Sequence, residues 1–109
     1  MINDKYGYII VMYYPYTGDN IFVYDFERTV VKQLALPKLA DEYFVKNIKL
    51  LESAKGIYFF GISYIENDED HICISICTNS DSGKGELVED RLLDLRDLEF
   101  KNSINVLSD

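Results

Sequence analysis

The chain has 109 residues, a hydrophobic fraction of 48% and a formal net charge of −8. This length fits a single globular domain over residues 1–109, and the hydrophobic fraction excludes a wholly disordered chain. Nineteen acidic against eleven basic residues argue against direct nucleic-acid binding, because phosphate neutralisation needs clustered lysine and arginine. No apolar run approaches the ~20 residues that span a bilayer, and no signal-peptide pattern is present. We therefore expect a cytoplasmic protein that does not engage a membrane.

The cysteines support this expectation. Cys73 and Cys77 lie in the segment HICISIC, which alternates like a strand. Four residues along a strand separate two Cα atoms by about 13 Å, and a disulfide requires less than about 7 Å. The two cysteines therefore cannot pair with each other within that strand, and two reduced thiols are typical of a reducing compartment.

The first third of the chain is rich in β-branched and aromatic residues. This composition predicts strands over residues 8–14 and 21–26, with a shorter third strand over 29–34. Between the first two, Pro15, Gly18 and Asn20 favour a turn.

A helix is predicted from Pro37, where the missing N–H is not needed, to a stop at Gly56. Its apolar stripe has helical spacing and consists of Ala40, Phe44, Ile48 and Leu51. Strands over 57–65 and 71–78 follow, joined by an acidic turn at 66–70.

A second helix is predicted after a loop at 79–85, again from an apolar stripe: Val88, Leu92, Leu95 and Leu98. Residues 100–107 are predicted to form either a final edge strand or a packed tail. The predicted fold class is therefore α+β, an antiparallel sheet of four to six strands with two helices packed on one face, in the order ββ(β)αββα(β).

His71 is the only histidine, and it shares a strand face with Cys73. These two could reach one zinc ion, but two further ligands would have to come from elsewhere in the chain. A Cys–His nucleophilic pair lacks a group that would orient the histidine. A central strand with small residues on one side is the simpler interpretation, so we predict neither a catalytic residue nor a metal site.

Two loops have the composition of ligand loops without the required spacing. In the loop at 78–85, Lys84 is followed by Gly85, where a phosphate loop has Ser or Thr. The acidic turn at 66–70 lacks the glycine and the closing glutamate of a calcium loop, whose positions hold His71 and Cys77. We predict no cofactor for either loop.

The charge is asymmetric along the chain. Residues 1–55 hold seven acidic and seven basic side chains, whereas residues 56–109 hold twelve and four. Charge concentrated on one side can steer a basic partner, although it also serves as a solvated face that keeps a protein soluble. The predicted acidic partner-binding residues lie in the turn and on the second helix: Asp68, Glu69, Asp70, Glu86, Glu89, Asp90, Asp94 and Asp97.

Tyrosine is abundant, with nine residues and no tryptophan. Alternation places Tyr13 on one face of the first strand with Ile9 and Val11, and Tyr24 on one face of the second strand with Phe22 and Phe26. Two helices cover only one face of the sheet in a chain this short, so we expect the second face to be an aromatic, partly exposed surface. Exposed aromatic faces tend to be interfaces, so we predict that both tyrosines anchor a partner. A loop or the C-terminal tail folding over this face is the alternative.

These patterns favour a non-enzymatic, acidic protein-binding domain that engages a basic protein such as a nuclease. By analogy of class, an inhibitor or immunity-type protein of bacterial or phage origin fits, including one that mimics nucleic acid. A small-molecule-binding regulatory domain or small complex subunit, a homodimer through its aromatic sheet face, remains the alternative.

Overall fold

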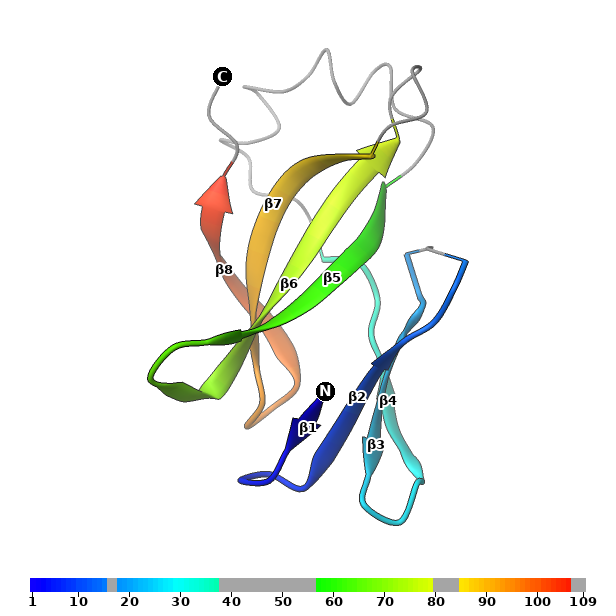
Figure 1. Cartoon of the computed structure of the whole chain (residues 1–109), viewed down its shortest axis with the longest axis vertical. Helices are drawn as coiled ribbons and strands as arrows, with labels where there is room; N and C mark the ends of the chain where they lie inside the picture. Colours follow the sequence, from blue (N-terminus) through cyan, green and yellow to red (C-terminus); the bar gives the residue numbers. More distant parts are fainter. Residues whose placement is uncertain (16–17, 38–56, 80–84, 107–109) are drawn as a thin grey trace.

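The structure is a computed structural model that describes residues 1–15, 18–37, 57–79 and 85–106. Over these ranges the chain forms strands and no helix, arranged as two four-stranded antiparallel sheets (Figure 1). Sheet A has the order β1-β2-β3-β4 and sheet B the order β5-β6-β7-β8. Each sheet is therefore a meander in which neighbours in sequence are neighbours in space.

Sheet A contains the three strands expected in this part of the chain and one more. Its members are β1 (Ile2–Asn3), β2 (Tyr8–Met12), β3 (Ile21–Asp25) and β4 (Val30–Gln33). The prediction missed β1, because two residues are too short to show an alternating pattern.

Sheet B is built from longer strands. They are β5 (Ile57–Ile65), β6 (Asp68–Asn79), β7 (Gly85–Asp94) and β8 (Glu99–Val106). The turn between β5 and β6 is shorter than the expected acidic turn, because β6 already begins at Asp68. Asn67 has a φ of 62° in that turn, a left-handed conformation that asparagine tolerates better than most residues. Of the two alternatives for residues 100–107, the edge strand is the correct one.

One hydrophobic core joins the two sheets. Ile10 and Val23 contribute to it from sheet A, and Ile74 and Leu93 from sheet B, each at most 1% exposed. Full burial of a side chain of this size stabilises a fold by about 1.5–3 kcal/mol. Because the sheets bury these faces against each other, the opposite face of sheet A is not covered by this core.

The predicted second helix is wrong, since residues 85–94 form β7 and pair with both β6 and β8. Leucines at 92, 93, 95 and 98 satisfy both a helical and an alternating pattern, so periodicity could not decide between them. In the strand, Leu93 is 0% exposed while its neighbour Leu92 is half-buried. Glu89 and Arg91 concealed the alternation, because both point inward as a buried ion pair.

The predicted first helix, over residues 37–56, falls almost entirely outside the described residues. The α+β fold class with helices on one face is nevertheless overturned, because the described residues consist of two packed sheets. No helix long and apolar enough to cross a membrane occurs in the described part of the chain.

Candidate functional site

Tyr13 and Tyr24, the two tyrosines predicted as anchors, lie side by side on sheet A. Strand register places Ile9 opposite Tyr24 and Val11 opposite Phe22, so these side chains share one face. This face points away from the core that holds Ile10 and Val23. We call it the outer face and define it by Ile2, Ile9, Val11, Tyr13, Phe22 and Tyr24.

The aromatic rings of the outer face hold one another in place. The Tyr13 and Tyr24 hydroxyl oxygens are 2.7 Å apart, and this hydrogen bond raises the pKa of Tyr24. The ring of Phe22 meets Tyr13 edge-on at 5.5 Å and stacks on Tyr24 at 6.3 Å between centroids. Rings fixed in this way can contact a partner with little loss of conformational freedom.

A shallow pocket marks the centre of the outer face. It has a volume of about 290 Å³ and is lined by Ile9, Val11, Tyr13, Tyr24 and Arg28. Tyr13 is 45% exposed, so its ring forms an accessible wall. The predicted exposed aromatic surface is therefore present, although a second sheet rather than two helices covers the opposite side.

The acidic residues of the β5–β6 turn lie at one end of the molecule, which we call the turn end. Here the turns β1–β2, β5–β6 and β7–β8 come together (Figure 1). The Asp70 carboxylate accepts hydrogen bonds from Lys5 Nζ at 2.7 Å and from the Tyr6 hydroxyl. The backbone carbonyl of Asp70 accepts a hydrogen bond from the N–H of Leu95 at 2.8 Å. Asp70 thus ties all three turns together.

His71 lies between two carboxylates of the turn end. Its Nδ1 is 2.9 Å from Asp68 Oδ2, and its Nε2 is 3.5 Å from Asp94 Oδ2. Asp94 also accepts two hydrogen bonds from Arg96, from Nε at 3.0 Å and Nη2 at 2.7 Å. Asp68 and Asp94 therefore serve internal contacts, although both were predicted to face a partner.

The remaining acidic side chains of the turn end face solvent. Asp97 is exposed and pairs with Lys101 Nζ at 2.7 Å. Asp4, Glu66 and Glu69 are also exposed and form no ion pair with any residue that the structure describes. Of the predicted acidic residues, Glu69 and Asp97 are thus the exposed ones at the turn end, where Asp4 and Glu66 are exposed as well.

The other predicted acidic residues lie elsewhere, on β7. Glu89 is 0% exposed, with its carboxylate held by Arg91. Asp90 accepts a hydrogen bond from Ser75 Oγ at 2.6 Å and is half-buried. Glu86 lies opposite Thr78 in the β6–β7 ladder, and its side chain is outside the described residues. The single acidic face expected on a helix is therefore absent.

An open pocket of about 530 Å³ connects the turn end with the outer face. Its lining includes Ile2, Tyr64, Glu69 and His71. The Tyr64 hydroxyl donates a hydrogen bond to the backbone carbonyl of Ile2 at 2.8 Å. Ile2 is also the cross-strand neighbour of Ile9, so the apolar outer face begins at the rim of this acidic pocket.

The thiols lack the features of reactive or metal-binding groups. Cys73 and Cys77 are free, as their spacing predicted, and both are buried. Burial raises the pKa of the Cys77 thiol to about 11 and raises that of Cys73, so neither is a thiolate at neutral pH. Within the described ranges, no group of three or more His, Cys, Asp or Glu side chains is arranged to hold a metal ion.

The ion pairs of the turn end predict a loss of stability in acid. Arg96 holds the pKa of Asp94 well below its usual range, Lys5 lowers the pKa of Asp70, and Lys101 lowers that of Asp97. Carboxyls with lowered pKa stabilise the fold above their unfolded pKa, near 4, and lose that contribution as pH falls. The urea midpoint should therefore drop steadily below about pH 4. Asp94→Asn should reduce the size of this drop. A variant whose urea midpoint falls with pH as much as that of the wild type would contradict the role given to Asp94.

Comparisons with protein-family models, with curated proteins and with solved structures found no match to this chain.

The sequence patterns did not reveal Lys5 and Tyr6, which bind Asp70 in the turn end, or Ile2, which connects the acidic pocket with the outer face. Lys5 and Asp70 are separated by 65 positions, and no local pattern marks such a contact. Only a correct expectation of β1 would have placed Ile2 beside Ile9, and two residues give no periodic signal.

Proposed function

We propose that the chain is a non-enzymatic protein-binding domain that engages a basic protein. The partner docks an apolar segment on the outer face and places lysine or arginine side chains opposite the turn end. The continuity of these two surfaces at Ile2 supports the proposal most strongly. A protein of the inhibitor or immunity type, working in the cytoplasm, is the class that best fits such a surface.

The two surfaces have different roles in this proposal. Desolvated aromatic side chains supply most of the affinity of a protein interface, and tyrosine is frequent among its most important residues. Exposed charges instead raise the association rate and select a partner of opposite sign. With a net charge of −8, the chain repels its own copies and nucleic acid, and it attracts basic proteins.

The test begins with affinity capture of basic proteins from native host lysate, followed by titration of the purified partner. The double variant Tyr13→Ser/Tyr24→Ser should weaken binding by about 30-fold, the effect of losing a central anchor. Tyr14→Ser is the matched control, because Tyr14 is 84% exposed and lies outside the outer face. Equal affinities for the double variant and the control would refute a role for the outer face.

The electrostatic part of the proposal is tested separately. Glu66→Lys/Glu69→Lys should weaken binding by about fivefold at 0.05 M salt and have little effect at 0.5 M salt. The reason is that the Debye length, beyond which exposed charges are screened, shortens from about 10 Å at 0.1 M salt to about 3 Å at 1 M salt. These two residues are chosen because they form no ion pair among the described residues, so their reversal spares the turns. No difference between the two salt concentrations would refute the acidic contribution. A dimer in sedimentation that the tyrosine double variant abolishes would assign the outer face to a second copy instead.

A further inference from the structure

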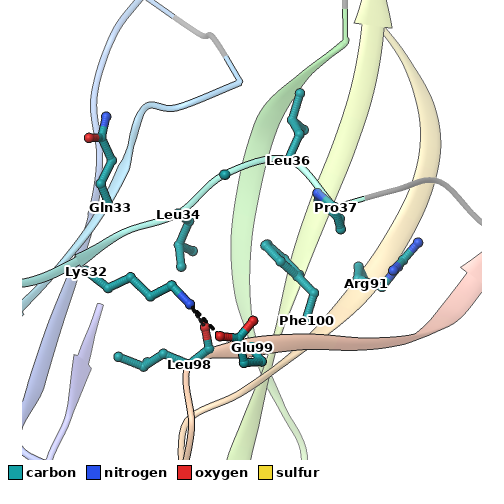
Figure 2. Close-up of a pocket in the computed structure, with 10 residues that line it drawn as sticks. Lys32, Gln33, Leu34, Leu36, Pro37, Arg91, Leu98, Glu99 and Phe100 are labelled. Carbon is teal, nitrogen blue, oxygen red and sulfur yellow. Dashed lines mark hydrogen bonds and ion pairs between the residues drawn. The ribbon is translucent and has the colours of Figure 1, made fainter.

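A third surface feature lies away from the outer face, beside the β7–β8 turn. It is a pocket of about 460 Å³ between the segment that continues β4 and the strands β7 and β8. Figure 2 shows the ring of Phe100 in the middle of this pocket, with Leu36 above it, Leu34 beside it and the side chain of Lys32 reaching in from the same side as Leu34. The volume lies within the range of small-molecule sites.

The apolar part of the pocket is fixed by packing. Phe100 is half-buried, and its ring stacks on Phe59 at 5.9 Å with an angle of 18° between the planes. Leu34 is 1% exposed and belongs to the core, whereas Leu36 is half-buried at its edge. A ring of a ligand can therefore pack against Phe100 and Leu36 without rearranging the core.

The polar part of the pocket holds two cations that differ in availability. Arg91 is buried and bound to the carboxylate of Glu89, so that pair is neutral. The ammonium of Lys32 donates to the backbone carbonyl of Leu98 at 2.7 Å and to Glu99 Oε1 at 3.1 Å. An ammonium has three N–H donors, so one remains for a ligand.

The Lys32–Glu99 ion pair is the weaker of the two. The Glu99 side chain is 64% exposed and that of Lys32 is 33% exposed, and exposed pairs contribute little to stability. Glu99 can turn into solvent at small cost, whereas the carbonyl of Leu98 keeps the ammonium at the pocket. The charge that stays in the pocket is therefore positive.

We propose that this pocket binds a small anionic molecule with an aromatic or branched apolar body. The carboxylate or sulfonate of the ligand replaces Glu99 on Lys32, and its apolar body packs against Phe100 and Leu36. This pocket is separate from the outer face, and its lining residues are not among those proposed to contact the protein partner.

The test uses a pair of fluorescent probes that differ in one group. 8-Anilinonaphthalene-1-sulfonate is anionic, and N-phenyl-1-naphthylamine has the same rings without the sulfonate. The anionic probe should bind saturably and about tenfold more tightly than the neutral one, as expected for a charge-assisted hydrogen bond. Chemical-shift changes in amide NMR spectra should centre on residues 32–36 and 98–100.

Two variants with opposite expected effects make the test specific. Lys32→Met keeps the aliphatic stem and should lower the affinity for the anionic probe about tenfold, with no change in the affinity for the neutral probe. Glu99→Gln removes the competing carboxylate and should raise the affinity for the anionic probe by about two- to threefold. Lys5→Met, at the turn end, is the matched control and should change the affinity for neither probe. Equal binding of both probes, or shifts centred on Tyr13 and Tyr24, would overturn the proposal.

Discussion

Replacement of Arg91 by methionine should destabilise the protein by about 3–5 kcal/mol, the usual effect of removing one partner of a buried ion pair. Glu89 is 0% exposed, and its Oε1 accepts a hydrogen bond from Arg91 Nε at 2.9 Å. Without the guanidinium, this carboxylate is left buried without its cation. Urea unfolding followed by circular dichroism measures the loss.

The double variant Glu89→Leu/Arg91→Met is the control for this prediction. It removes both charges and keeps apolar volume, a replacement that is often neutral or stabilising in buried pairs. The double variant should therefore recover most of the stability that Arg91→Met loses. If Arg91→Met changed the free energy of unfolding by less than about 1 kcal/mol, the pair would not be the buried element that the structure indicates.

Leu93→Ala should cost about 2–5 kcal/mol, the range for truncating a core leucine. Leu93 is 0% exposed and belongs to the shared core of the two sheets, where it lies opposite Ile72 in the β6–β7 ladder. Its truncation leaves a cavity that the surrounding strands cannot fully close. The measurement is the same urea titration, with the slope of the transition compared to confirm that only stability has changed.

Leu92→Ala is the matched control and also distinguishes a strand from a helix. The helical pattern predicted a buried Leu92 in the stripe with Leu95, whereas β7 leaves Leu92 half-buried on the opposite face from Leu93. In the strand, Leu92→Ala should cost about 1 kcal/mol. The reverse order of the two effects would support the helix and contradict β7.

The strands of the first sheet illustrate how far local patterns reach. Ile10 in β2 and Val23 in β3 are buried between half-buried neighbours, and only an extended backbone puts Ile10 and Val23 in a core while Tyr13 and Tyr24 stay at a surface. Composition and turn residues were sufficient to predict both strands, but the face that Tyr13 and Tyr24 share depends on the register of β2 with β3, which only the structure shows. The rise per residue along a strand was sufficient to show that Cys73 and Cys77 cannot pair within theirs.

Segment 85–98 shows where local patterns fail. A buried Glu89–Arg91 pair violates the rule that charged side chains point outward, and the neighbouring leucines suit either period. The strand forms because β6 and β8 supply backbone partners and the core supplies a site for Leu93. Neither condition can be read from the segment itself, since both depend on residues distant in the chain.

The sequence by itself determined the acidic character, the free thiols and the two aromatic-rich strands β2 and β3. Tertiary structure alone decided that β7 is a strand, that Glu89 is buried and that Lys5 meets Asp70 at the turn end. It also brought Ile2 to the rim of the acidic pocket. The physical reason is that alternation and composition act between neighbours in the chain, whereas strand pairing and charge burial depend on which distant segments the core brings together.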